Sequence, residues 1–251
     1  MVQHLALALP WKLLLQLMID LKNRSYQKEL MDGENIPFAD MAQTLEELNV
    51  INTMLGGHSI TLKGVAHFLK NQHKITICEI GCGGGDNLFA IDRIFKNKQV
   101  DANFIGIDIK NSCIEYARTK YPALPCEWIC SDYKKVNFDT QPTIIFNSLF
   151  CHHFTDEQLV YMLQWMHQNS TKGFFINDLH RNAIAYYLIK WITAAFSKSY
   201  LVKNDACLSV ARSFSKKDWE NIFSKAGIHG FTIQWQWAFR WLVFCEKNDL
   251  I

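Results

Sequence analysis

The stretch CEIGCGGGDN, residues 78–87, combines four glycines with two acidic side chains. Glycine tolerates positive φ and lets a ligand approach the backbone, so such a loop after a strand is suited to hold a cofactor. A dinucleotide fingerprint needs a third glycine where Asp86 stands, and the carboxylates of Asp86 and Glu79 repel a pyrophosphate at the start of a helix. A cofactor that carries a sulfonium and an ammonium group prefers the same carboxylates. These residues therefore predict a site for a cationic cofactor.

A second group of residues capable of chemistry follows two apolar runs, TIIFNSLFCHHF and GFFINDLHR. A neutral imidazole, with an ordinary pKa of about 6.5, takes a proton from a phenol or a stabilised enol near neutral pH. Adjacent residues rarely face one pocket together, so only one of the two histidines is expected to be the base. We place His153 ahead of His152 in this role, with His180 and Asp178 as residues that support or replace it. The alternative for each histidine is a helix cap or a buried, hydrogen-bonded role. The same two runs also contribute Asn147, Asn177 and Arg181.

Both groups belong to a regular alternation of short apolar runs and helix-length amphipathic segments. The predicted strands cover residues 74–80, 103–109, 126–130, 143–150 and 173–179. The predicted helices cover 87–97, 111–121, 155–169, a long stretch ending at Lys198, and 215–228. Strands that alternate with helices form a parallel sheet covered on both faces, and its ligands bind beyond the carboxyl ends of the strands.

The last predicted element, GFTIQWQWAFRWLVFCEK, is aromatic-rich and has almost no connection between its two halves. This pattern predicts an antiparallel hairpin on the edge of the sheet. The fold class is therefore α/β: a Rossmann-like, doubly wound, mostly parallel sheet of seven strands, with a helical N-terminal extension.

Composition limits the classes of protein that remain. The chain has 251 residues, of which 49% are hydrophobic and 20% charged, as is usual for a soluble globular protein with one main core. A formal charge of +2 gives no reason to expect a nucleic-acid partner. The eight cysteines form no CxxC pair, and several lie in apolar runs, so we expect reduced, buried thiols in a cytoplasmic protein.

Residues 1–72 are predicted to form a helical extension or cap, and residues 73–251 the main domain. Helical patches in the extension are interrupted at Asp32-Gly33, Pro37 and Gly56-Gly57. From Trp11 onward the pattern is that of an amphipathic helix, too interrupted by polar residues for a membrane span and lacking the features of a secretory signal. We expect this helix to pack on the domain or on a second subunit; the alternative is contact with a membrane surface or an apolar substrate. The oligomeric state stays open.

The glycine stretch resembles a known family. Glu79, Gly81, Gly83 and Gly85 follow the ExGxGxG pattern of motif I in the class I methyltransferases that use S-adenosylmethionine. The resemblance covers about residues 45 to 247. It implies that S-adenosylmethionine is bound and S-adenosylhomocysteine released by residues in and around the loop: Glu79, Gly81, Cys82, Gly83, Gly85, Asp108, Ile109, Asp132, Tyr133 and Asn147.

Within that family, acids at two later strand ends have characteristic roles. An acid after the second strand holds the ribose hydroxyls, and Asp108 stands in that place. A second acid after the third strand meets the adenine amino group, and Asp132 matches it, with Tyr133 or Ile109 against the ring faces. The alternative for each acid is a helix cap at a strand-to-helix turn.

The resemblance also places the methyl acceptor after strands four and five, where the histidines lie. It implies in-line displacement with a histidine base. The turn after strand four lacks the NPPY-type sequence of amide and adenine methyltransferases, and Pro125-Cys126 precedes strand three rather than following strand four. Asn177-Asp178 matches the metal-dependent catechol enzymes only faintly, so no metal is expected.

Taken over its whole length, the chain is similar to bacterial methyltransferases of polyketide or phenolic-lipid biosynthesis, through ELMD, LGGHSITLKG and SLFCHHFTDEQL. The resemblance implies O- or C-methylation of a small, apolar phenolic or polyketide-like metabolite. Two alternatives stay open: a nicotinamide-dependent oxidoreductase, and a noncatalytic binding module that keeps the nucleotide pocket.

Overall fold

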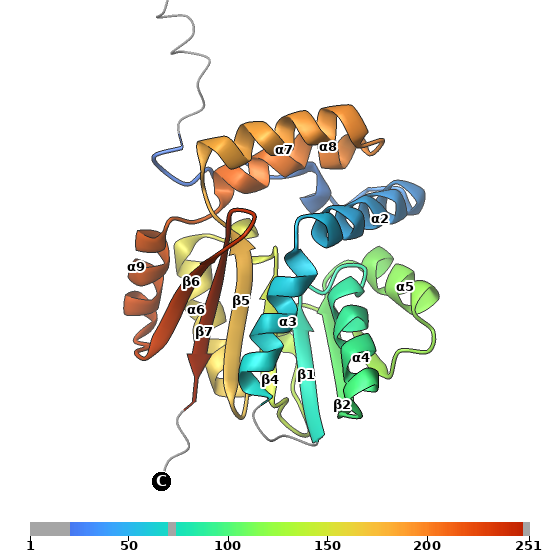
Figure 1. Ribbon diagram of the computed structural model, residues 1–251, viewed down its shortest axis with the longest axis vertical. Helices are drawn as coiled ribbons and strands as arrows, with labels where there is room; N and C mark the ends of the chain where they lie inside the picture. Colours follow the sequence, from blue (N-terminus) through green and yellow to red (C-terminus); the bar gives the residue numbers. More distant parts are fainter. Residues whose placement is uncertain (1–20, 70–73, 248–251) are drawn as a thin grey trace, which may run out of the picture.

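The computed structural model describes residues 21–69 and 74–247, and its centre is one seven-stranded sheet (Figure 1). The strand order is β3-β2-β1-β4-β5-β7-β6. Strands β1 to β5 pair in parallel, and β7 pairs antiparallel with both β5 and β6. This confirms the predicted parallel sheet with an antiparallel hairpin at its edge. The strands are β1 (Lys74–Ile80), β2 (Asp101–Asp108), β3 (Cys126–Cys130), β4 (Ile144–Ser148), β5 (Gly173–Leu179), β6 (Phe231–Gln236) and β7 (Arg240–Glu246).

Helices cover both faces of this sheet, as a doubly wound fold requires. On one face α3 (Gly57–Phe68) and α4 (Asp86–Lys98) bury Ile60, Val65, Leu88, Ile91 and Phe95. On the other face α6 (Asp156–Asn169) and α9 (Lys216–Ala226) bury Leu159, Met162, Trp219, Ile222 and Phe223. Helix α5 (Asn111–Lys120) packs against β2 and β3. Capping boxes at Thr155 and Ser215 fix where α6 and α9 begin.

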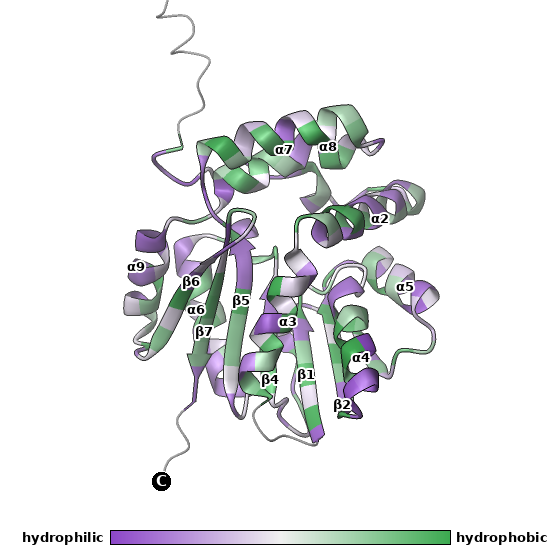
Figure 2. Cartoon of the chain, viewed as in Figure 1, coloured by the Kyte–Doolittle hydropathy of each residue, from purple (hydrophilic) through white to green (hydrophobic). Residues whose placement is uncertain are grey.

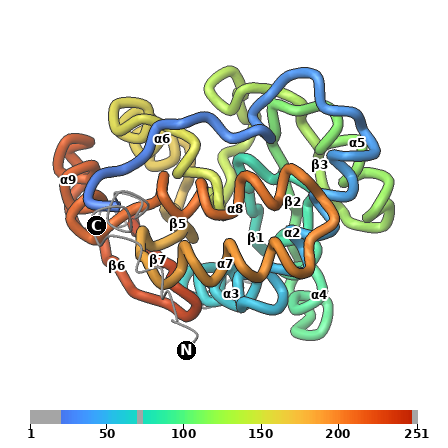
Figure 3. Tube along the Cα trace, turned by 90° about the horizontal axis from the view of Figure 1, so that it is seen from above, coloured from blue at the N-terminus to red at the C-terminus, as the bar shows by residue number. Residues whose placement is uncertain are grey.

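A layer of helices lies over the carboxyl ends of the parallel strands. It consists of η1 (Leu30–Asp32), α2 (Phe38–Met54), α7 (Ala183–Phe196) and α8 (Tyr200–Arg212) (Figure 1). Seen from above, the segment that precedes α2 crosses the molecule from the side of α9 to the side of α5 (Figure 3). We call these four elements the cap. It covers the sheet edge where a ligand of a doubly wound fold binds.

Several of the predicted helix boundaries occur in the structure. Helix η1 ends at Asp32, Pro37 precedes α2, and Gly56 lies between α2 and α3. The long helix predicted to reach Lys198 ends two residues earlier, and α8 was not predicted. Ser199 begins α8 by accepting a hydrogen bond from the Val202 N–H. The division of the chain at residue 72 stays a prediction, because residues 70–73 lie outside the described ranges.

The amphipathic helix predicted from Trp11 also lies outside the described residues, apart from Leu21. Its contact with a membrane therefore stays a prediction. Across residues 21–69 and 74–247, no helix has both the length and the apolar character that spanning a bilayer requires.

Candidate active site

The glycine loop lies between β1 and α4, at the carboxyl edge of the sheet. The N–H groups of Gly81 and Cys82 donate to the Ile107 carbonyl at 2.8 and 3.0 Å, which fixes the loop to β2. Gly81 has φ +67°, and a Cβ there would lie 2.2 Å from the Phe150 ring. Gly83 has φ +50°, and a Cβ there would meet only Leu45, at 3.7 Å. Protein packing thus excludes a side chain at Gly81, whereas the space beside Gly83 stays open to a ligand.

Asp108, the last residue of β2, faces this loop. Its carboxylate accepts hydrogen bonds from the Gly83 N–H at 2.9 Å and from the Lys110 N–H at 2.8 Å. Burial raises the pKa of Asp108 above its ordinary value, although these two N–H groups, Lys110 and His153 act to lower it. The carboxylate is therefore held at one position with lone pairs left for further donors. Ile109, the next residue, is 69% exposed beyond the strand.

Glu79 lies beneath the loop and is almost completely buried. Its Oε1 accepts a hydrogen bond from Asn87 Nδ2 at 2.9 Å, while Oε2 is buried without a hydrogen-bond partner in the described chain. Burial, with the nearby Asp86 and Asp108, raises the pKa of Glu79 well above its ordinary value. Asp86 itself lies 2.6 Å from His58 Nε2. The region therefore contains three carboxyl groups, and a cation is the ligand that would stabilise their ionised forms.

The residues predicted at strand three occupy two different environments. Asp132 is half-buried and caps the short helix η2 (Tyr133–Lys135), accepting from the Lys134 N–H at 3.1 Å. Tyr133 lies in the core, edge-on to Trp165 at 5.1 Å, and its hydroxyl is buried without a hydrogen-bond partner among the described residues. Of the two residues proposed for the adenine ring faces, only Ile109 is exposed at the carboxyl edge.

Asn147 points away from the cofactor loop. Its Nδ2 lies 3.6 Å from Met166 Sδ and 3.8 Å from Met162 Sδ, both on α6, and its Oδ1 accepts from the Cys151 thiol at 3.2 Å. Burial raises the pKa of that thiol well above its ordinary value, which suits a packing role. Cys82 is buried too, and burial likewise raises the pKa of its thiol.

His152 and His153 form the short helix η3 (Cys151–His153) directly after β4. The chain turns sharply there, because Leu149 adopts φ +53°, a strained conformation for a side-chain-bearing residue. The His152 side chain is 3% exposed, and its Nδ1 lies 2.8 Å from Asp178 Oδ1. Burial acts to raise the pKa of Asp178, but His152, the Leu179 N–H and His153 together lower it below its ordinary value. An ionised Asp178 places the imidazole hydrogen on Nδ1 and leaves Nε2 as the free nitrogen.

His153 is the more accessible of the two, with its side chain 22% exposed. Its Nδ1 lies 2.9 Å from Asp32 Oδ1, close enough to form an ion pair when the imidazole is protonated. Burial opposes ionisation of Asp32, but His153 and Arg212 lower its pKa overall. Asp32 is thus an anion beside the His153 ring.

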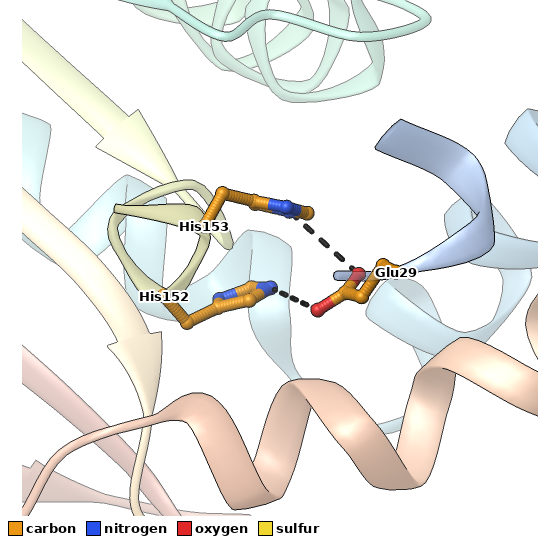
Figure 4. Close-up of side chains that lie close together, drawn as sticks. All are labelled: Glu29, His152 and His153. Carbon is orange, nitrogen blue, oxygen red and sulfur yellow. Dashed lines mark ion pairs between the residues drawn. The ribbon is translucent and has the colours of Figure 1, made fainter. Parts of the chain in front are cut away.

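Glu29 was not predicted as a site residue, and it joins the two histidines (Figure 4). Its Oε1 lies 3.7 Å from His152 Nε2 and its Oε2 lies 3.8 Å from His153 Nε2. Its other neighbours come from α8: Ser209 donates to Oε1 at 3.0 Å, and Arg212 Nε lies 3.6 Å away. Burial raises the pKa of Glu29 to about 7 despite His153 and Arg212. The sequence carries no local signal for this contact, because Glu29 and the histidines are more than 120 positions apart.

Asp205 and Asn87 also escaped prediction. Asp205 on α8 accepts the Leu30 and Met31 N–H groups, both at 2.8 Å, and so holds Glu29 in place. Asn87 connects Glu79 to Thr61 of α3. Both residues position other site residues and do not themselves face space for a ligand.

His180 does not join the histidine pair. Its backbone N–H donates to the Phe239 carbonyl at 2.9 Å, and its ring lies 4.8 Å from Trp241. Burial and the neighbouring Arg181 lower the pKa of this imidazole. Arg181 pairs with Asp218 at 2.8 Å, and Asn177 binds Gly57 and Thr61 of α3. Of the four proposed catalytic residues, the structure thus groups His152, His153 and Asp178.

Replacement of Glu29 by glutamine is expected to stabilise the protein at pH 8 by about 2 kcal/mol and to change little at pH 5. The folded-state pKa of about 7 exceeds the ordinary 4.5, so the folded chain binds the proton more tightly than the unfolded one. The cost of ionising Glu29 therefore grows as pH rises from about 4.5 to 7, and an uncharged amide does not incur it. Urea unfolding at both pH values measures the difference.

Asp32→Asn is the matched control, since its pKa is lowered rather than raised. It should destabilise the protein at pH 5 and at pH 8 alike, and the effect should fade only under strongly acidic conditions. Equal effects of Glu29→Gln at both pH values would contradict a buried, titrating carboxyl group.

Comparison with known proteins agrees with this geometry. Residues 77–173 match the family model described as "Methyltransferase domain". The plantazolicin methyltransferase BpumL, solved with SAH, is 14% identical with a TM-score of 0.64, over 84% of this chain and 96% of its own. A SAM-dependent methyltransferase from Aquifex aeolicus is 16% identical with a TM-score of 0.58, over 84% and 99%. Human N-acetylserotonin methyltransferase, solved with SAM, is 11% identical with a TM-score of 0.59, over 85% and 57%.

Comparison with curated protein sequences gives no match. Residues 77–173 contain the glycine loop, Asp108 and the histidine pair, and their match to a methyltransferase domain agrees with the strand order of the sheet. The match supports an enzyme of the transferase type.

Proposed function

We propose that the glycine loop binds S-adenosylmethionine and that the enzyme methylates a small, apolar phenolic or polyketide-like acceptor. The observation that carries this proposal is the Asp108 carboxylate, held against Gly83 with lone pairs free for the ribose hydroxyls. The buried Glu79 Oε2, which has no hydrogen-bond partner among the described residues, suits an ammonium donor. When bound, the cofactor supplies a methyl group from its sulfonium and leaves as S-adenosylhomocysteine.

Further residues complete the proposed cofactor site. Gly81, Cys82 and Gly85 shape the loop, Ile109 covers one face of the adenine ring, and Asp132 meets the adenine amino group. Tyr133 and Asn147 support this site from the core rather than touching the cofactor, because their contacts are with Trp165 and with the α6 methionines.

In the proposed reaction His153 is the base that takes the proton of the acceptor hydroxyl or enol. It is the accessible member of the pair, and its imidazole is one of the groups that act on the pKa of Asp108, so it lies within electrostatic range of the cofactor site. Proton transfer makes His153 cationic. The carboxylates of Glu29 and Asp32, on either side of the ring, stabilise that cation.

The remaining proposed residues orient this base. His152 is buried between Asp178 and Glu29 and fixes the position of the Glu29 carboxyl group. His180 acts at most indirectly, through its packing on Trp241 beside Asp178 in the β5–β7 pair.

An apolar acceptor is supported by the composition of the cap above the loop. Met31, Ile36 and Met41 pack together with Leu45, which borders Gly83. Two structural neighbours are named for individual compounds, plantazolicin and N-acetylserotonin, rather than for macromolecules.

The test combines cofactor binding with methyl transfer. S-adenosylmethionine and S-adenosylhomocysteine should each raise the melting temperature by several degrees, whereas NADH and NADPH should not. Labelled methyl should then appear on long-chain alkylphenols or alkylresorcinols, and not on the same compounds with every hydroxyl already methylated and the ring positions blocked. A melting shift with NADPH alone would favour the oxidoreductase alternative.

Three donor groups, those of Glu29, His152 and His153, also lie within 4.8 Å of one another, close enough to ligate a metal. We propose that they work without one. Activity should therefore be unchanged by EDTA and by added Mg²⁺, Mn²⁺ or Zn²⁺. If EDTA abolished activity and one of these ions restored it, the result would indicate a metal centre in place of a histidine base. If cofactor binds but no acceptor is methylated, the noncatalytic alternative gains support.

A further inference from the structure

Helix α7 buries one stripe of side chains and exposes a second stripe that is equally apolar. Ala185 and Thr193 are buried and Ile189 is half-buried, at intervals of four residues. The adjoining, solvent-facing side carries the exposed residues Ile184 (62%), Leu188 (45%), Trp191 (68%), Ile192 (37%) and Phe196 (82%). Figure 2 shows α7 as a largely hydrophobic helix on the outer side of the cap. A contiguous exposed apolar surface of this kind marks an interaction site.

The turn of the β6–β7 hairpin lies beside the segment that leads into α7. The Phe239 carbonyl accepts a hydrogen bond from the His180 N–H, three residues before the helix begins. Trp237, in the same turn, is 70% exposed. We define the α7 face as the five exposed residues of α7 together with Trp237. Its two tryptophans belong to the residue type that is enriched where proteins meet the lipid headgroups.

The charged side chains in the chain segment that contains α7 have one sign. Residues 179–204 contain no Asp or Glu. The same stretch carries Lys190, Lys198 and Lys203, all exposed. The carboxylate of Glu47, on α2, reaches the end of α7, but it is engaged there by Ser197 and by the backbone N–H groups of Lys198 and Ser199. An apolar stripe bordered by lysines is the composition of a helix that lies in the surface of an anionic membrane.

We infer that the α7 face binds the surface of a membrane that contains anionic lipids. The 14-residue helix lies on such a surface rather than crossing it, because it is too short to span. A second copy of the chain fits the face less well. A two-fold interface pairs a patch with itself, so the lysines of both copies would come together with no acid in the stretch to neutralise them. The inference does not depend on methyl transfer.

Vesicle co-sedimentation of the full chain tests the inference. We expect binding to vesicles with about one third phosphatidylglycerol, weakening as salt rises, and much weaker binding to pure phosphatidylcholine. The double variant Trp191→Ser with Phe196→Ser should bind at least about ten-fold more weakly. Tyr161→Ser, which removes an exposed aromatic from α6, is the matched control and should bind like wild type. Lys190→Glu should lower binding about five-fold or more and keeps the test valid if the double variant folds poorly.

Three results would overturn the inference. The first is that wild type and the double variant bind the vesicles equally, or that wild type binds both vesicle types equally. The second is a lipid-free dimer, seen by sedimentation velocity, that the double variant dissociates, since it would assign the face to another copy. The third is loss of binding in the full chain carrying Leu15→Ser and Met18→Ser but not in the α7 variants. S-adenosylhomocysteine affinity should be unchanged throughout, so failure of this inference is separate from failure of the proposed reaction.

Discussion

Asp108→Ala is expected to weaken S-adenosylhomocysteine binding at least about a hundred-fold, equivalent to about 3 kcal/mol. The substitution removes the charged group proposed to accept from the two ribose hydroxyls, and it leaves the Gly83 N–H without its present partner. Isothermal titration calorimetry measures the affinity directly. With ligand at about a hundred times the wild-type dissociation constant, the wild-type melting temperature should rise by roughly 5 to 10 °C, and the variant should show little shift.

The matched control for this prediction lies on the same strand. Asp101 begins β2 at the opposite, amino end and is exposed, so Asp101→Ala should bind the ligand like wild type. Asp132→Ala should fall between the two, with about a ten-fold loss. Affinity of Asp108→Ala within three-fold of wild type would remove the main support for the cofactor site.

His153→Ala is expected to lower kcat by about a hundred- to ten-thousand-fold while leaving cofactor affinity within about three-fold. The reason is that the variant lacks the group proposed to receive the acceptor proton, whereas Asp108 and the glycine loop are unchanged. The defect should shrink with more acidic acceptors, such as nitrophenols, because these lose their proton without help. A merely structural role would not produce that dependence on acceptor acidity.

Two further histidines separate this role from general effects. His167→Ala, on α6, should have near wild-type turnover. His152→Ala leaves the buried Asp178 carboxylate without its imidazole hydrogen bond, so it should cost about 3 kcal/mol of stability before any effect on the chemical step is measured. If His153→Ala turned over every acceptor at the wild-type rate, the base would have to be sought elsewhere in the cap.

The sheet and the glycine loop could be predicted because their signals are local. Each parallel strand is a short apolar run followed by a turn, and a proposed ligand-binding residue such as Asp108 lies at the end of such a run. The rule that ligands meet the carboxyl ends of these strands then places the loop and Asp108 together. The hydrogen bond between Gly83 and Asp108 forms because both residues lie at the carboxyl edge of the sheet.

The direction of side chains at the strand ends could not be predicted in the same way. In β4, Ile145 and Asn147 face α6, whereas Ile144, Phe146 and Ser148 face the other layer. The alternation follows from the two-residue period of a strand, but both faces of this sheet are apolar, so the pattern does not say which face is which. Asn147 therefore looked like a cofactor ligand and lies against the methionines of α6 instead.

Contacts made by the cap could not be predicted from local sequence patterns. Glu29 reaches the histidines because Asp205 holds the backbone of Leu30 and Met31 and because α8 packs beside η1. Helix α8 has no clear amphipathic period, and it is stabilised by its position between α7, α2 and η1. Neither feature is encoded within a short window of sequence.

The segment from Glu29 to Gly33 touches both halves of the proposed site at once. Glu29 and Asp32 contact the histidines, while the Gly33 carbonyl accepts a hydrogen bond from Lys110 Nζ at 2.7 Å, two residues beyond Asp108. The methyl donor and the methyl acceptor would therefore both affect the position of one short segment, each from a different end. Thermodynamic linkage then requires reciprocity: if bound donor changes the affinity for the acceptor by some factor through this segment, bound acceptor changes the affinity for the donor by the same factor. Weakening the Lys110 contact would uncouple the two.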